Sequence, residues 1–127
     1  MVVDTTALQE AFEWVRAGLG SRYTSPFEKA TVVLRTGGTR TFNGVSADQR
    51  VVGTTTTSSG PTPGGKKPVG KGSAIAELYY LTLARAETRL LVVTEPAFIK
   101  LLDRELHGAL DPGVELVHVP LPALTGR

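Results

Sequence analysis

Four basic side chains fall in a stretch of sequence that contains no acidic residue. The stretch from residue 49 to residue 76 has no Asp or Glu, and it holds the cations Arg50, Lys66, Lys67 and Lys71. Because the three lysines have no acidic neighbour in sequence to pair with, an external anion is a natural partner. The part at about residues 58–72 is rich in Gly and Pro and is expected to be a loop. The pattern predicts a phosphate-binding surface, and the alternative is a solvated basic loop without a ligand.

The same loop approaches a known phosphate-binding pattern. Residues 65–73, GKKPVGKGS, are close to G-x-x-x-x-G-K-[ST], and residues 90–95 could mimic the strand that carries the second metal acid. However, Gly72 stands where the hydroxyl that binds Mg²⁺ belongs, and residues 58–64 separate the pattern from the strand before it. Nucleotide hydrolysis is therefore a weak hypothesis. An anion held by backbone amides at residues 70–73 with Lys71 fits the sequence better.

Other side chains that commonly carry catalysis or metal binding are scarce. The chain has no Cys, and its two His residues, His107 and His118, have no third ligand type clustered beside them. A zinc site is therefore not expected. The serines near the basic loop lie far from any His, which gives no indication of a Ser-His-Asp triad. The absence of Cys also favours a cytoplasmic location.

The sequence around these groups predicts an amphipathic helix followed by a three-strand meander. Apolar residues recur at spacings of three and four from Leu8 through Phe12 to Leu19, which predicts a helix that ends near Gly18 or Gly20. Three short segments rich in β-branched residues follow at 30–35, 39–45 and 50–57, separated by turn-forming residues.

Two helices and two strands are expected in the second half. A helix from Ser73 to about residue 86 is apolar nearly all round and should be largely buried, with one of two adjacent tyrosines in the core and the other at the surface. The aliphatic run at 90–93 predicts a central parallel strand covered on both faces. A helix opening at Glu95 and Pro96, with His107 in its last turn and Gly108 as its C-terminal cap, leads to a strand at 114–119.

Length and composition fit one globular domain over residues 1–127. The apolar fraction is 41% and the charged fraction 20%, which is ordinary for a soluble protein, and the net charge is only +2. The longest apolar runs are too short to cross a bilayer, so no membrane partner is expected. The first four residues lead directly into a polar helix start, without the pattern of a secretory leader.

The order α-β-β-β-α-β, followed by an α-β unit, resembles the core of the restriction-endonuclease-like, or PD-(D/E)xK, superfamily. Local sequence adds to the resemblance. Residues 42–52, FNGVSADQRVV, look like the strand-turn-strand pattern FDGVS-x-D-x-R-V-V of small actinobacterial proteins assigned to this fold, and residues 113–120, GVELVHVP, are similar to their last strand. The resemblance covers nearly the whole chain and implies an α/β domain with a mixed sheet.

The resemblance also implies where an active site would lie. Active members place an acid at the end of the second strand and Glu-x-Lys on the third, and the metal held there activates water. In this sequence Asn43 occupies the first position. The third-strand pair would be Thr54 and Thr56, or Gly53 and Thr55 if the register shifts by one. None of these side chains offers the carboxylate that a Mg²⁺ site requires.

Carboxylates elsewhere could only partly replace the missing ones. Glu10 or Glu13 on the first helix could supply one carboxylate. Asp48 could supply another, although its position in a tight turn favours a turn-forming role. A basic side chain could come from the loop, from Lys66, Lys67 or Lys71.

The sequence therefore predicts a degenerate, noncatalytic nuclease-fold domain that acts as an accessory module and binds nucleic acid or protein. The alternative is a metal-dependent nuclease with a rearranged active site, and a nucleotide- or phosphate-binding protein is the third hypothesis. No cofactor is expected, except Mg²⁺ under the nuclease alternative. The expected partners are nucleic acid, through the basic loop, and a protein or a second copy of the chain.

Overall fold

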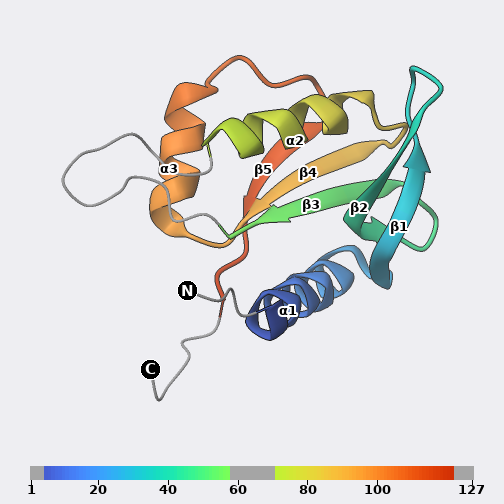
Figure 1. Cartoon of the computed structure of the whole chain (residues 1–127), viewed down its shortest axis with the longest axis horizontal. Helices are drawn as coiled ribbons and strands as arrows, with labels where there is room; N and C mark the ends of the chain where they lie inside the picture. Colours follow the sequence, from blue (N-terminus) through green and yellow to red (C-terminus); the bar gives the residue numbers. More distant parts are fainter. Residues whose placement is uncertain (1–4, 58–70, 122–127) are drawn as a thin grey trace.

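The computed structural model describes residues 5–57 and 71–121, and it describes side chains for residues 9–57 and 73–121. Within these residues the chain forms a five-stranded mixed sheet, with helix α1 on one face and helices α2 and α3 on the other (Figure 1). The elements are α1 (Thr5–Tyr23), β1 (Phe27–Val33), β2 (Thr39–Ser46), β3 (Val51–Thr56), α2 (Lys71–Leu83), β4 (Thr88–Val93), α3 (Pro96–Glu105) and β5 (Val114–His118). The expected α/β class and element order are confirmed.

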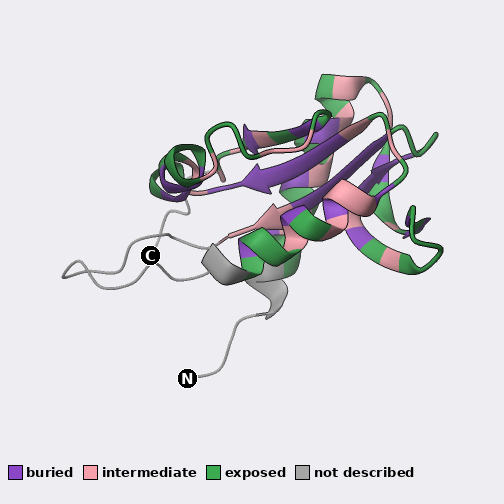
Figure 2. Ribbon diagram, turned by 90° about the horizontal axis from the view of Figure 1, so that it is seen from above, coloured by how far each residue is buried: buried purple, intermediate pink, exposed green. Residues whose placement is uncertain are grey.

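The sheet has the order β1-β2-β3-β4-β5. Strands β1, β2 and β3 pair antiparallel, whereas β3, β4 and β5 pair parallel, so the predicted meander and parallel unit are both found. Residues 90–93 of β4 are completely buried, with exposed fractions of 0%. Figure 2 shows this central strand in the colour of buried residues. The continuous aliphatic run indicated this position correctly, because only a strand covered on both faces buries every side chain.

Each face of the sheet has its own apolar core. The face under α2 and α3 holds the larger cluster, which includes Phe42, Val45 and Phe98. The face over α1 holds a smaller cluster, in which Val15 and Leu19 of the helix pack with buried strand residues. The sheet is thus held from both sides, and strand side chains are placed by alternation between the two clusters.

Strand β2 contains a β-bulge. Glu28 of β1 pairs with Val45 of β2, and Ala30 pairs with Phe42, so β2 uses one residue more than β1 over the same stretch. The extra residue falls at Asn43 and Gly44. As a consequence Phe42 and Val45 reach the same core cluster although three positions separate them. A bulge re-aims side chains and is common beside functional sites.

Strands β2 and β3 separate just beyond this bulge. They pair only at Gly44 with Gly53 and at Val45 with Val52, so the part of β2 before Gly44 has no ladder with β3. We call this point of separation the β2–β3 fork. It opens beside Asn43 and Thr54.

The predictions for α1 and α2 need correction. Helix α1 continues to Tyr23 rather than ending near Gly18 or Gly20, because Leu19 is anchored in the core with 1% exposure and a Gly in a helix weakens it without ending it. The chain leaves the helix at Thr24, which has a φ of 50°. Helix α2 is not buried all round, since Ile75 is 43% and Tyr79 is 61% exposed.

The exposure of α2 follows from its position as an outer layer, because only the face toward the sheet is covered. Of the two adjacent tyrosines, Tyr80 packs against the core and Tyr79 is exposed, as expected. The prediction for the end of α3 was long by two residues: the helix ends at Glu105, so His107 lies beyond it, and Gly108 takes a φ of 74° in the following turn. No helix in the described part of the chain is long and apolar enough to cross a membrane.

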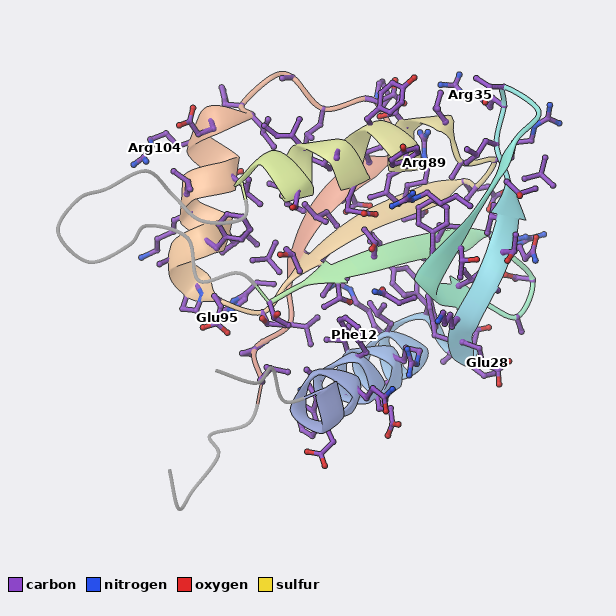
Figure 3. The ribbon with its side chains drawn as sticks, in the orientation of Figure 1. Phe12, Glu28, Arg35, Arg89, Glu95 and Arg104 are labelled. Carbon is purple, nitrogen blue, oxygen red and sulfur yellow. The ribbon has the colours of Figure 1, made fainter. Side chains whose placement is uncertain are left out.

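A buried arginine at the start of β4 connects the elements around the parallel strands β4 and β5. Arg89 is 8% exposed and donates to the carbonyl oxygens of Thr82 at 3.0 Å and Pro112 at 2.6 Å, and to the carboxylate of Asp111 at 3.0 Å (Figure 3). It thus joins the end of α2 to the turn before β5. Gly113 next to it has a φ of 90°, and a Cβ there would lie 2.7 Å from the guanidinium, so this position requires Gly.

Candidate functional site at the β2–β3 fork

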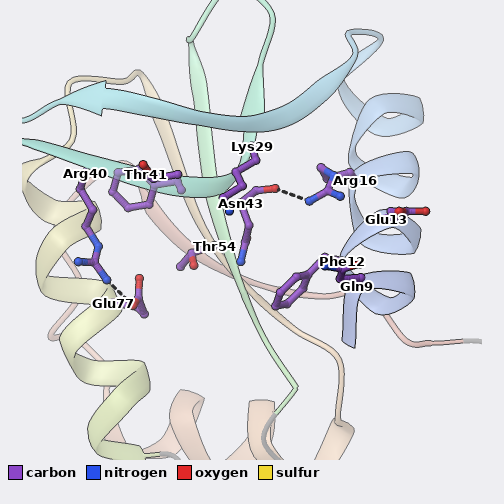
Figure 4. Close-up of a pocket in the computed structure, with 11 residues that line it drawn as sticks. Gln9, Phe12, Glu13, Arg16, Lys29, Arg40, Thr41, Asn43, Thr54 and Glu77 are labelled. Carbon is purple, nitrogen blue, oxygen red and sulfur yellow. Dashed lines mark hydrogen bonds and ion pairs between the residues drawn. The ribbon is translucent and has the colours of Figure 1, made fainter. Parts of the chain in front are cut away.

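A cleft of about 520 Å³ opens at the β2–β3 fork, between α1 and α2 (Figure 4). Its walls come from α1, β1, β2, β3 and α2. Residues of two helices that lie on opposite faces of the sheet thus line one cleft, at the place where the sheet is open. We call it the fork cleft. It is lined by Gln9, Phe12, Glu13, Arg16, Lys29, Arg40, Thr41, Phe42, Asn43, Thr54 and Glu77.

Asn43 is held in one orientation by two hydrogen bonds. Its main-chain carbonyl accepts a hydrogen bond of 3.0 Å from Nη1 of Arg16, and its side-chain Oδ1 accepts one of 3.0 Å from the backbone N–H of Thr55. The second bond takes the place of the ladder bond that is missing where β2 and β3 separate. Because an N–H can only donate, the amide oxygen must face Thr55. The Nδ2 group is left without a hydrogen bond among the described residues, and it carries two N–H donors.

Three basic side chains line the same cleft as this amide. Arg16 lies on the cleft-facing side of α1 and uses one of its nitrogens to hold Asn43. Lys29 lies on β1 opposite the bulge and is exposed. Arg40, on β2, forms an ion pair of 2.7 Å with Glu77, and its guanidinium lies 3.8 Å from the centre of the Tyr80 ring. The cleft therefore presents several N–H donors to whatever occupies it.

Acidic side chains are fewer, and one of them is already paired. Glu13 on α1 and Glu77 on α2 are the two acids in the lining, against three cations. Glu77 is neutralised by Arg40. Within residues 9–57 and 73–121, no three His, Cys, Asp or Glu side chains gather in the manner of a metal site. The geometry of the described residues thus favours an anionic ligand over a cation.

Thr54 contributes a hydroxyl to the inner wall. It is 6% exposed, lies opposite Leu91 in the register with β4, and its Oγ1 makes no hydrogen bond among the described residues. It also lines a second hollow of about 230 Å³ next to the fork cleft. The two hollows share three residues, which are Asn43, Thr54 and Glu77, so they adjoin one another.

The structure brings some of the expected site residues together and separates others. Asn43 and Thr54, the positions that the resemblance assigned to the site, line the fork cleft together with Glu13, one of the two candidate substitute carboxylates, whereas the other, Glu10, is exposed and does not line it. Thr56 belongs to the second hollow. Among the loop cations, Lys66 and Lys67 and the side chain of Lys71 lie outside the described residues.

Asp48 and Arg50 lie in the β2–β3 turn, at the closed end of the pair and away from the fork cleft. Asp48 accepts hydrogen bonds from Ser46 Oγ at 2.8 Å and from the backbone N–H of Arg50 at 3.0 Å. These two bonds lower the pKa of the Asp48 carboxyl below its usual range, the backbone bond more strongly. Arg50 approaches the carboxylates of Asp48 and Glu87, at 3.9 Å each. The Asp48 carboxylate therefore stabilises the β2–β3 turn.

Sequence reasoning did not single out Arg16, Lys29, Arg40 or Glu77. Each comes from a different element, and no local pattern links them. Phe12 was expected in the core of the first helix but lines the cleft instead. The spacing of Phe12 and Arg16 by four residues, which places both on one side of a helix, was the available signal.

Comparison with known proteins identifies no relative. The chain matches no family model, and searches of the curated proteins and of the solved structures find no match.

Proposed function

We propose that this chain is a noncatalytic domain of the restriction-endonuclease-like fold and that it binds nucleic acid through phosphate contacts in the fork cleft. The fold assignment is supported by the order α-β-β-β-α-β and by the position of the cleft, which lies where the resemblance to that superfamily implies an active site. The binding assignment is supported by the donors that line the cleft.

The observation that carries the proposal is the orientation of Asn43. Its Oδ1 accepts the N–H of Thr55, so the oxygen that could have served a metal ion is already engaged. What remains for a ligand is an NH₂ group, with Arg16 and Lys29 beside it. Phosphate oxygens accept hydrogen bonds from such donors, and charge-assisted bonds of this kind are about twice as strong as neutral ones.

The basic segment near residues 58–72 extends the proposal. Its lysines lie outside the described side chains, so their contribution stays a prediction from the sequence. If they bind the phosphate backbone as well, they would act in addition to the fork cleft, because each neutralised phosphate adds to the salt dependence of binding.

The test is the affinity for DNA and RNA oligonucleotides at two salt concentrations. Arg16→Ala and Lys29→Ala should each weaken binding and lower the logarithmic salt slope by roughly 0.7–0.9 for each phosphate that is no longer neutralised. Arg85→Ala and Lys100→Ala are matched controls, since both side chains lie outside the cleft lining. These controls should leave the slope unchanged. Failure of the protein to bind any nucleic acid at low salt would reject the proposal and favour a protein partner.

A metal-dependent nuclease is the second candidate, because Glu13 does lie in the fork cleft together with the hydroxyl of Thr54. Its test is cleavage of plasmid DNA with Mg²⁺ or Mn²⁺. Under our proposal no cleavage is expected. Cleavage that disappears in Glu13→Ala, with the fold intact, would favour the nuclease.

A further inference from the structure

The fork cleft contains an aromatic ring that packs in neither of the two apolar cores. Phe12 is half-buried and lines the cleft, but it belongs neither to the cluster under α2 nor to the cluster over α1. Its neighbours on α1, by contrast, are used for packing, since Val15 and Leu19 are 1% exposed. A large apolar side chain left in a polar cleft indicates a ligand with a flat apolar face.

The ring and the cations lie on one side of the same helix. Gln9, Phe12 and Arg16 follow at spacings of three and four residues, so they share one side of α1, next to the side that packs on the sheet through Val15 and Leu19. Four helical residues correspond to a rise of about 6 Å between Phe12 and Arg16. Figure 4 shows Phe12 and Arg16 on the wall that α1 forms, Arg40 and Glu77 on the opposite side, and Asn43 and Thr54 between the two sides, with Lys29 nearer to Arg16 than to Phe12. Along α1 the cleft wall thus passes from an aromatic ring to a cation.

We infer that the fork cleft holds one unpaired nucleotide of a single-stranded nucleic acid. The base stacks on Phe12, and the side-chain amide of Gln9 is placed to hydrogen-bond its edge. The phosphate accepts from Arg16, Lys29 and the NH₂ group of Asn43. This inference rests on the proposed function and adds to it the class of nucleic acid.

The requirement for an unpaired base follows from access to the ring. In a duplex both faces of each base are covered by its neighbours, so a base reaches an aromatic side chain in a cleft only if it leaves the stack. Single strands expose these faces, and aromatic platforms beside a basic groove are the common way to bind them. The volume of about 520 Å³ lies in the range of small-molecule sites and is far too small for a duplex.

The experiment compares ligands and ring substitutions in the full chain. The probes are an oligothymidylate, an oligouridylate, a duplex of the same length and an abasic oligonucleotide that retains only sugar and phosphate. Phe12→Ala should weaken binding of the two single strands by about fivefold or more, as expected when one base–aromatic stack is removed. It should leave binding of the abasic strand unchanged. The two single strands separate DNA from RNA as the source of the nucleotide.

Two further variants separate stacking from packing. Phe12→Tyr keeps an aromatic ring and should bind single strands like the wild type, whereas Phe12→Leu keeps an apolar side chain of similar reach and should bind like Phe12→Ala. Equal binding of duplex and single strand, or normal binding by Phe12→Leu, would overturn the inference while leaving phosphate binding by the cleft in place. Absence of binding to every probe would instead overturn the proposed function.

Discussion

The substitution Asn43→Asp separates the structural role of Asn43 from its role toward a ligand. An aspartate oxygen can still accept the N–H of Thr55, which now lies 3.0 Å from Oδ1, so the junction of β2 with β3 should persist. The NH₂ group, however, is replaced by a carboxylate oxygen. The cleft would lose a donor and gain a negative charge beside the position proposed for the phosphate.

The magnitude follows from these two changes. Removal of a hydrogen bond to a charged group costs about 1.5 kcal/mol at the lower end of the usual range. Two like charges about 4 Å apart add about 1 kcal/mol of repulsion even at the dielectric constant of water. The sum of roughly 2.5 kcal/mol corresponds to roughly 70-fold weaker binding of nucleic acid. Stability should stay within about 1 kcal/mol of the wild type, because the backbone hydrogen bond is retained.

Fluorescence anisotropy with a labelled oligonucleotide measures the affinity, and urea unfolding measures the stability. Asn43→Ala is the complementary variant: it removes the acceptor of Thr55 and should lower the free energy of unfolding by about 1–3 kcal/mol. If Asn43→Asp binds nucleic acid as tightly as the wild type, Asn43 does not touch the ligand and the proposed phosphate position is wrong. If the same variant gains Mg²⁺-dependent cleavage without a decrease in affinity, the nuclease alternative is favoured.

Three other sets of substitutions test the buried arginine, the β2–β3 turn and the basic loop. Arg89→Ala should lower the free energy of unfolding by about 2–4 kcal/mol in urea titrations, because it leaves the Pro112 carbonyl without the donor that the buried guanidinium supplies and removes the ion-pair partner of Asp111; a decrease below about 1 kcal/mol would contradict this role. The lowered pKa of Asp48 stabilises the fold above the unfolded-state pKa of about 3.9, and this contribution disappears as the pH falls through the folded-state value. Asp48→Asn should therefore make the free energy of unfolding fall less steeply as the pH is lowered into the acid range. An unchanged dependence on pH would show that other groups cause the loss of stability in acid. The triple variant Lys66→Ala, Lys67→Ala and Lys71→Ala should lower the logarithmic salt slope by roughly 0.7–0.9 for each phosphate that these lysines neutralise, whereas an unchanged slope would confine phosphate binding to the fork cleft.

The elements with strong local patterns were predictable from the sequence. The aliphatic run at 90–93 indicated a central parallel strand because burial on both faces leaves no room for alternation. The β-branched segments separated by turn-forming residues likewise indicated the meander. Asp48 was assigned to a turn because its side chain can accept the N–H of the residue two positions later, and it does accept that of Arg50.

The fork cleft was only partly predictable. Asn43 was named through the resemblance and Glu13 as a possible substitute carboxylate, but Lys29 and Glu77 reach the cleft through long-range pairing and helix packing that no local pattern records. The bulge at Asn43 and Gly44 also has no clear sequence signal, although it sets the direction of the side chains around it. Helix α2 was expected to be buried because its composition is apolar, yet composition does not tell whether a further layer covers a helix. Tyr79 is exposed for that reason.

Nuclear magnetic resonance titration with a short oligonucleotide tests the central claim most directly, since it follows the side-chain NH₂ group of Asn43 itself. We expect the two NH₂ resonances of Asn43 and the backbone signals of Arg16 and Lys29 to shift together as the ligand is added. The shifts should weaken with rising salt, whereas signals of the Asp48 turn should stay in place. Binding that leaves the Asn43 NH₂ resonances unmoved would contradict the claim that donors in the fork cleft hold the phosphate.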